Sequence, residues 1–142
     1  MYEANGKRDL ARKHYEQALA IDPRLGWAAN NLAWMHASDG GDLDVALSLA
    51  QKAKEQLPDS PIVSDTLGWI LYKKGMHAAA LPVLQECVKQ VPSSATYRYH
   101  LGMALLAGGK KKEASVSLEA ARRLKLTPKE DQEAVAALAS LK

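Results

Sequence analysis

Apolar positions along the chain follow the rotation of a helix. In residues 65–75, DTLGWILYKKG, a rotation of about 100° per residue places Leu67 and Leu71 on one face. Trp69 and Tyr72 then fall nearly opposite, on a face that would normally meet solvent. No segment alternates with the two-residue period of a β-strand. We therefore predict an all-α fold, with a second apolar stripe that needs an explanation.

Small and apolar residues also repeat every 34 or 35 positions. The repeating sets are Pro23, Pro58 and Pro92; Leu32, Leu67 and Leu101; Ala46, Ala80 and Ala114; and Ala53, Cys87 and Ala121. A fixed spacing of this length indicates tandem helical hairpins. Ala33 and Ala46 are 13 positions apart, whereas Gly68 and Ala80 are 12 apart. We therefore expect one extra residue in the first turn between paired helices.

Helix start and stop signals divide each period into two helices joined by a turn that contains glycine. The expected pairs cover residues 25–38 and 43–56, then 61–74 and 78–91, then 95–108 and 111–124. A single helix over about residues 7–21 precedes them. After them, Thr127 as N-cap, Pro128 in the first turn and Glu130 closing a capping box predict a final helix. Recurrent Gly and Ala allow the paired helices to approach closely.

These spacings and residue types resemble the tetratricopeptide repeat family, and the resemblance covers nearly the whole chain. It rests on Leu followed by a small residue in each first helix, Ala in each second helix and a closing Pro. It implies a right-handed α-solenoid of helix-turn-helix hairpins with a C-terminal capping helix. The expected single domain, 1–142, consists of the second helix of a truncated repeat (1–24), three full repeats (25–58, 59–92 and 93–126) and the capping helix (127–142).

A narrower resemblance concerns the phrases LGWILYKKGMHAAALPVLQECV and YHLGMALLAGGKKKEA. They are similar to the terminal repeats of bacterial lipoproteins of this family that are associated with exopolysaccharide production and protein sorting. This implies a periplasmic, membrane-tethered parent, whereas the chain alone carries no address and would be placed in the cytoplasm. We expect the chain to be the C-terminal part of a longer array, able to self-associate through its uncapped N-terminal helix. That helix would expose Leu10, Ala11, Tyr15 and Ala18.

In such a stack the first helices line a concave inner wall, where we place the second stripe. The wall residues are Trp27, Asn30 and Trp34 from the first repeat; Ile62, Asp65, Trp69, Tyr72 and Lys73 from the second; and Thr96, Tyr99, Met103 and Leu106 from the third. Aromatic residues and Met beside a few polar groups are typical of protein-binding surfaces. An alternative is that Trp34 and Trp69 pack on each other and seal the seam between repeats.

The expected function is a protein–protein interaction scaffold that holds a helix or an extended peptide of its partner through apolar anchors. Some family members grip a C-terminal carboxylate with Lys, Asn and Arg, but only Asn31 occupies a matching position here, so we reject that mode. Two alternatives stay open. One is a purely architectural segment of a longer array, and the other is a helical repeat that binds nucleic acid.

The nucleic-acid alternative depends on charge. The chain has a net charge of +3, and residues 92–126 alone carry +5, largely from Lys110–Lys112 and the end of the following helix. A loop and a helix terminus explain these cations without a nucleic-acid partner, because such binding usually needs a broader basic surface.

Catalytic and metal chemistry lacks support in the sequence. The four histidines are scattered without metal-ligand spacing, and no nucleophile motif or phosphate-binding loop occurs. Cys87 is the single cysteine and fits a buried small side chain. No apolar run reaches the length of a membrane span. We expect no enzymatic activity, no cofactor and no metal.

Overall fold

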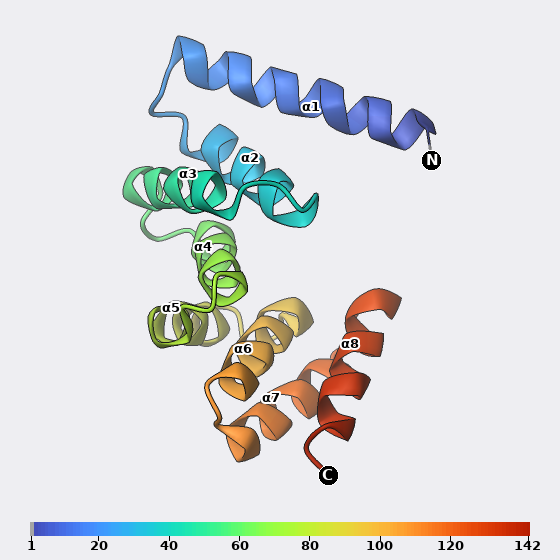
Figure 1. Cartoon of the computed structure of the whole chain (residues 1–142). Coiled ribbons are helices and arrows are strands. Elements are labelled where there is room, and N and C mark those ends of the chain that lie inside the picture. Colours follow the sequence, from blue (N-terminus) through green and yellow to red (C-terminus); the bar gives the residue numbers. More distant parts are fainter. Residues whose placement is uncertain (1) are drawn as a thin grey trace. The chain divides into compact units, whose positions relative to one another are not determined.

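The structure, a computed structural model, describes residues 2–142, with side chains from Gly6 onward (Figure 1). Met1, the first residue of the predicted half repeat, lies outside the described residues. The chain divides into two compact units, Met1–Ile70 and Leu71–Lys142. All regular elements of the described residues are helices, which confirms the predicted all-α fold.

The first unit contains three complete helices and most of a fourth. They are α1 (Tyr2–Ile21), α2 (Gly26–Ser38), α3 (Leu43–Gln56) and α4 (Pro61–Lys73). α1 packs on α2, and α2 packs on α3. Ala29, Ala53 and Val63 form a buried cluster from α2, α3 and α4, and Leu19 and Leu49 pack against it.

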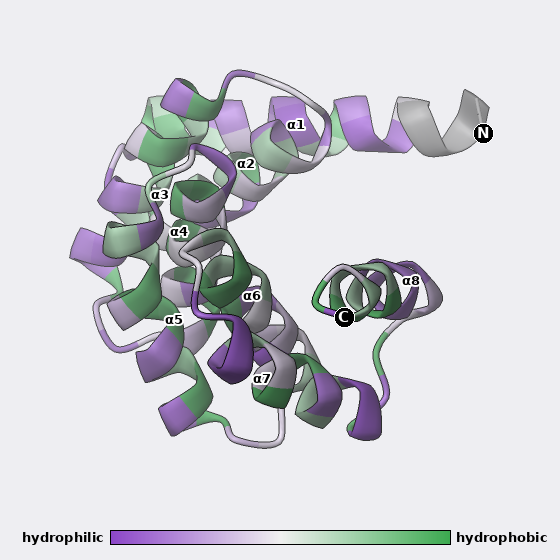
Figure 2. Ribbon diagram, turned by 60° about the horizontal axis from the view of Figure 1, so that its bottom comes forward, coloured by the Kyte–Doolittle hydropathy of each residue, from purple (hydrophilic) through white to green (hydrophobic). Residues whose placement is uncertain are grey.

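The second unit begins in the last turn of α4. It continues with α5 (His77–Gln90), α6 (Ala95–Ala107), α7 (Lys111–Arg123) and α8 (Pro128–Ala139). α6 packs on α5 and α7, and α8 packs on both α6 and α7. Polar and apolar segments alternate along the ribbons of α5 and α7 (Figure 2), as expected for helices with one buried face.

Close helix packing depends on small residues, as the sequence predicts. A Cβ atom added to Gly102 on α6 would lie 2.7 Å from Cγ and Cδ2 of Leu118 on α7. Ala114, Leu118 and Ala121 on α7 are all fully buried. Glycine at position 102 therefore allows α6 to approach α7 at this crossing.

The three turns between paired helices share a left-handed glycine. Gly40, Gly75 and Gly109 have φ angles of 70°, 79° and 81°, a conformation that side chains disfavour. The first turn covers residues 39–42, whereas the other two cover residues 74–76 and 108–110. The extra residue therefore lies where the sequence places it.

The helix boundaries agree with the prediction to within one residue, except at the start of α1. That helix begins at Tyr2 rather than near residue 7, because the residues before Lys7 include no helix breaker other than Gly6. At the other end, the side chain of Thr127 accepts a hydrogen bond from the N–H of Glu130, and the Glu130 carboxylate accepts one from the N–H of Thr127. The predicted capping box is confirmed.

α1 is attached to α2 by charge as well as by apolar contact. Arg12 pairs with Asp39 at 3.1 Å, and Arg8 donates a hydrogen bond to the same carboxylate. Ala11 and Ala18 are only partly buried, whereas the equivalent residues of the three full repeats are fully buried. Among the described helices, none has the length and hydropathy needed to traverse a bilayer.

Candidate functional site

Three residues of the predicted wall lie on one stripe of α2. Trp27, Asn30 and Trp34 are spaced by three and four residues, so their side chains share a helix face. Trp27 is 52% exposed and Trp34 is 38% exposed, whereas Asn30 is 6% exposed. The stripe therefore presents two accessible indoles on either side of a buried amide.

The ring of Trp27 is braced by α1. Tyr15 meets it edge to face, with ring centroids 6.3 Å apart and an interplanar angle of 80°. This geometry suits two aromatic rings because the positive edge of one faces the negative face of the other. Trp27 is thus held in place by α1 while half of its surface stays accessible.

The side-chain amide of Asn30, between the two indoles, lacks a hydrogen bond to its oxygen. The Oδ1 atom of Asn30 is buried and has no hydrogen-bond partner among the described residues. Most buried polar atoms in proteins are hydrogen-bonded, so an acceptor in this state is a notable exception.

In the part of α4 that belongs to the first unit, the predicted wall residues also include both exposed and buried side chains. Ile62 is 64% exposed, Asp65 is buried and Trp69 is partly buried. Beside them Lys54 donates a hydrogen bond of 2.6 Å to the hydroxyl of Ser64, which links α3 to α4. Neither Trp34 nor Trp69 is fully enclosed, so both indoles keep accessible surface.

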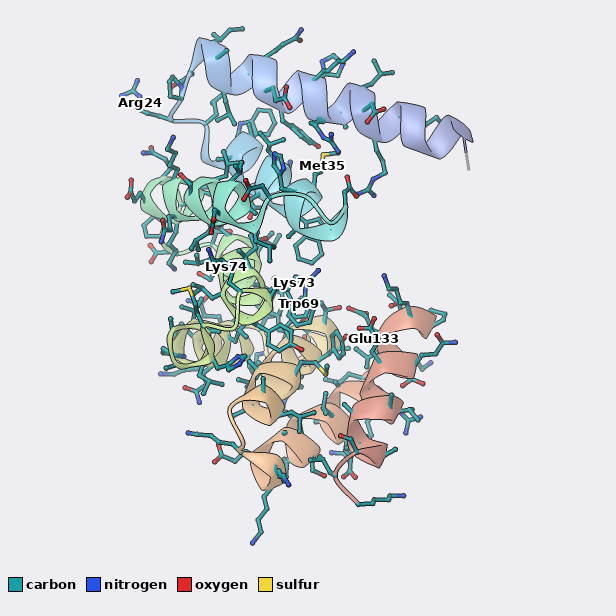
Figure 3. The ribbon with its side chains drawn as sticks, in the orientation of Figure 1. Arg24, Met35, Trp69, Lys73, Lys74 and Glu133 are labelled. Atoms are coloured by element: carbon teal, nitrogen blue, oxygen red, sulfur yellow. The ribbon has the colours of Figure 1, made fainter. Side chains whose placement is uncertain are left out.

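In the second unit, two residues of the predicted wall on α6 bind carboxylates of α8. The hydroxyl of Tyr99 donates a hydrogen bond to Glu133, and the hydroxyl of Thr96 donates one to Glu130 at 3.1 Å. Figure 3 shows Glu133 on α8. Tyr99 is 2% exposed, so its ring fills the space between the helices and only its hydroxyl contributes polar chemistry.

Burial and the carboxylate change the acidity of two tyrosines. Burial, followed by the hydrogen bond to Glu133, raises the pKa of Tyr99 above its ordinary value of 10.0. Burial also raises the pKa of Tyr72, and the charge of Glu133 adds to the effect. Tyr72, Tyr99 and Glu133 therefore form one electrostatic cluster within the second unit.

The remaining wall residues of the second unit differ in exposure. Lys73 is exposed, whereas Met103 and Leu106 are partly buried. Glu130 and Glu133 were not among the predicted wall residues. The repeat spacing does indicate these two glutamates, because they follow Thr96 and Tyr99 by 34 positions. The sequence, however, predicts residues 127–142 as a capping helix and not as a further repeat.

Some basic residues of the third repeat form hydrogen bonds or ion pairs within the protein. Arg98 donates a hydrogen bond of 2.8 Å to the carbonyl of Pro92, and Arg122 pairs with Asp131 at 2.7 Å. Lys110–Lys112 are exposed at the turn before and the start of α7. Arg123 and Lys125 are exposed as well, so the exposed cations of the third repeat lie at the two ends of α7.

A hollow in the second unit is lined by none of the predicted wall residues. It has a volume of about 330 Å³ and lies among α5, α6 and α7. Its lining includes Leu101, Leu105 and Val116, and Val116 is 68% exposed. No sequence pattern singled it out, because its apolar residues belong to two different helices, α6 and α7.

Two observations on the described part of the chain bear on metal and thiol chemistry. No group of three or more His, Cys, Asp or Glu side chains there could hold a metal ion. Cys87 is fully buried in α5, in line with its interpretation as a core residue.

Comparison with known proteins gives a consistent result. The family model of the tetratricopeptide repeat matches residues 2–61 and 66–131. The TPR repeat-containing protein PA4667 of Pseudomonas aeruginosa is 31% identical over 91 residues, which is 63% of this chain. The match spans only 15% of that relative's length.

Solved structures share the fold at low sequence identity. MamA from Desulfovibrio magneticus RS-1 has a TM-score of 0.74 at 18% identity, covering 97% of this chain and 85% of its own. YrrB, described as a TPR protein with an unusual peptide-binding site, has a TM-score of 0.74 at 20% identity, covering 98% and 70%. The first TPR domain of human RPAP3 has a TM-score of 0.69 at 20% identity, covering 84% and 96%.

Proposed function

Since the chain belongs to the tetratricopeptide repeat family, we propose that it binds a peptide segment of a partner protein through the aromatic residues of its first helices. Proteins of this family are in general non-catalytic scaffolds for protein–protein interaction, and YrrB, which shares the fold, has a peptide-binding site. The candidate contacts are those residues predicted for the inner wall that keep accessible surface, which leaves out the buried Asn30, Asp65 and Tyr99.

One observation carries the proposal: α2 keeps two tryptophans accessible, at 52% and 38% exposure. Large apolar side chains are normally withdrawn from water, and tryptophan is among the commonest hot spots of protein interfaces. Tyr15 holds the ring of Trp27, so binding would cost little ordering of that side chain.

The test uses peptides selected from a displayed library of short random sequences on the wild-type chain. Replacing both Trp27 and Trp34 by alanine should weaken their binding about 30-fold or more, because a hot-spot residue contributes about 2 kcal/mol. Val45→Ala is the matched control, since Val45 is also an exposed apolar residue, on α3. Equal affinities for wild type and the double variant would remove the proposal.

The seam interpretation of Trp34 and Trp69 makes a different prediction. If these rings mainly join neighbouring first helices, Trp69→Ala lowers the free energy of unfolding and leaves peptide affinity unchanged. If they contact a partner, the affinity falls and stability changes little. Measuring both quantities on the same variant distinguishes the two roles.

Nucleic-acid binding is the second candidate, and the exposed Lys110–Lys112 cluster favours it. Such binding would weaken steeply as salt is added, because phosphate contacts release counterions. Binding through tryptophan would be nearly independent of salt. A purely architectural segment would bind neither class of ligand. Self-association through α1 is a separate prediction, which light scattering at high protein concentration tests.

A further inference from the structure

The hollow in the second unit combines buried and exposed apolar side chains. Leu101 and Leu105 on α6 are 8% and 2% exposed, whereas Val116 on α7 is 68% exposed. Gln85 and Ser117 add neutral polar groups to the lining. A lining of apolar side chains with a few polar groups is typical of sites that accept a ligand.

A run of lysines borders this hollow. Lys112 is part of the lining, Lys110 and Lys111 directly precede it along the chain, and all three are exposed. Glu113 also lines the hollow, so residues 110–113 carry three positive charges and one negative charge, a net charge of +2. An apolar hollow and a positively charged edge therefore meet at the start of α7.

Neither feature is required by the packing of a hairpin. The position of Val116 is held by Ser48 in the first repeat and by Pro82 in the second. The three lysines have no counterparts either, because residues 42–44 are DLD and residues 76–78 are MHA. Equivalent helices form with these other residues, so the valine and the lysines of the third repeat are available for a different role.

We propose that this hollow binds an acidic segment of a partner protein, with an apolar side chain of the segment inside it and carboxylates beside the lysines. The volume of about 330 Å³ lies at the lower end of the range for ligand pockets, about 300–1,000 Å³, which limits the anchor to one or two side chains. Gln85 and Ser117 carry groups that can hydrogen-bond to the backbone of the segment.

The hollow favours an acidic protein segment over a nucleic acid at these lysines. Duplex DNA presents about one negative charge per 1.7 Å of its axis, so a broad basic surface holds it best. Single-stranded nucleic acids gain affinity by stacking their bases on aromatic side chains. The seven residues that line the hollow include no aromatic residue.

The acidic segment is also better supplied by another protein than by a second copy of this chain. α8 is the most acidic helix of the chain, with three carboxylates and one lysine. All three carboxylates already bind side chains of α6 or α7 within the second unit.

The experiment selects displayed peptides of random sequence on the wild-type chain and discards those that also bind Val116→Ser. This substitution should leave the fold intact, because Val116 is exposed and the first repeat has serine at the equivalent position. Peptides that bind the surface of Trp27 and Trp34 bind both chains and are discarded. The retained peptides should combine Asp or Glu with a large apolar residue. If no peptide is retained, or if the retained peptides lack acidic residues, the inference is wrong.

Fluorescence anisotropy then measures the affinity of the retained peptides. Val116→Ser should weaken binding about fivefold or more, because burial of one methylene group alone corresponds to about fourfold. Lys112→Ala, which introduces the residue of the second repeat, should weaken binding about twofold to fivefold in dilute salt and less in concentrated salt. Val45→Ser and Lys52→Ala change exposed residues of α3 and should stay within about twofold of wild type. An unchanged affinity of Lys112→Ala in dilute salt would overturn the role of charge.

Methyl NMR of the wild-type chain with a retained peptide locates the contact without any substitution. The methyl signals of Leu101, Leu105 and Val116 should shift as peptide is added, whereas those of Ile62 on α4 should not. Shifts at Ile62 alone would contradict the inference.

Further outcomes would assign the hollow or the lysines to a different ligand and overturn the inference. One is self-association of wild type, seen by light scattering, that Val116→Ser abolishes. Another is binding of a single-stranded RNA that Lys112→Ala weakens and Val116→Ser does not. The retained peptides should bind the variant with alanine at Trp27 and Trp34 as tightly as wild type, so failure of the proposed function leaves this inference standing.

Discussion

Gly102→Ala tests whether close packing of α6 on α7 determines the residue at this position. On an exposed helix, replacing Gly by Ala stabilises by about 1 kcal/mol. Here the added Cβ would lie 2.7 Å from two carbons of Leu118 and 3.3 Å from its backbone nitrogen. Leu118 is fully buried, so it has no free space to move into, and overpacking of this kind costs about 1–3 kcal/mol.

The two effects sum to a net destabilisation of up to about 2 kcal/mol. Gly6→Ala is the matched control, because Gly6 is also inside a helix but no atom lies within 4 Å of its added Cβ. That variant should stabilise the protein by up to about 1 kcal/mol. Urea unfolding followed by far-UV circular dichroism measures both changes.

A third variant isolates the cause. In a Leu118→Ala background, which itself costs about 2–5 kcal/mol, the methyl group of Gly102→Ala enters the space that Leu118 left. The second substitution should then be neutral or stabilising, with a coupling free energy of at least about 0.5 kcal/mol. If Gly102→Ala stabilises the wild type as much as Gly6→Ala does, the close-approach argument fails.

Two further predictions concern charged and polar contacts. The unfolded chain ionises its tyrosines near pH 10, whereas the raised pKa of Tyr99 keeps it neutral in the folded state, so stability should fall as pH rises above about 10. Urea titrations at pH 8 and pH 11 check this, and Tyr99→Phe should show a smaller fall; equal falls would contradict the role of the hydroxyl. Asp39→Asn should cost less than about 1 kcal/mol, because its ion pairs with Arg8 and Arg12 are partly exposed, yet it should speed hydrogen exchange in α1. Unchanged exchange there would show that apolar contacts alone hold α1.

The repeat was predictable because one packing requirement recurs at one spacing. Each hairpin needs a small residue where its helices cross, a glycine in its turn and an apolar residue on each buried face. These needs leave the 34-residue pattern that Gly102, Ala114 and Gly109 illustrate. The extra residue of the first turn was predictable for the same reason, because it shifts this pattern by one position.

The details of the candidate site were less predictable. Helical periodicity assigns Trp27, Asn30 and Trp34 to one face, but exposure depends on the side chains that neighbouring helices contribute. The burial of Asn30 and Tyr99 therefore could not be foreseen. Pairing of Arg12 with Asp39 was also missed, since long charged side chains choose partners by geometry that spacing does not encode.

The hydrogen bonds of Thr96 to Glu130 and of Tyr99 to Glu133 each join residues 34 positions apart. In each hydrogen bond, donor and acceptor therefore occupy equivalent positions one hairpin apart. Duplicating residues 93–126 would place the new threonine and tyrosine where the two glutamates now stand, and would carry the glutamates one step outward. Insertion of a whole hairpin before α8 would therefore keep a threonine and a tyrosine opposite the two carboxylates of α8.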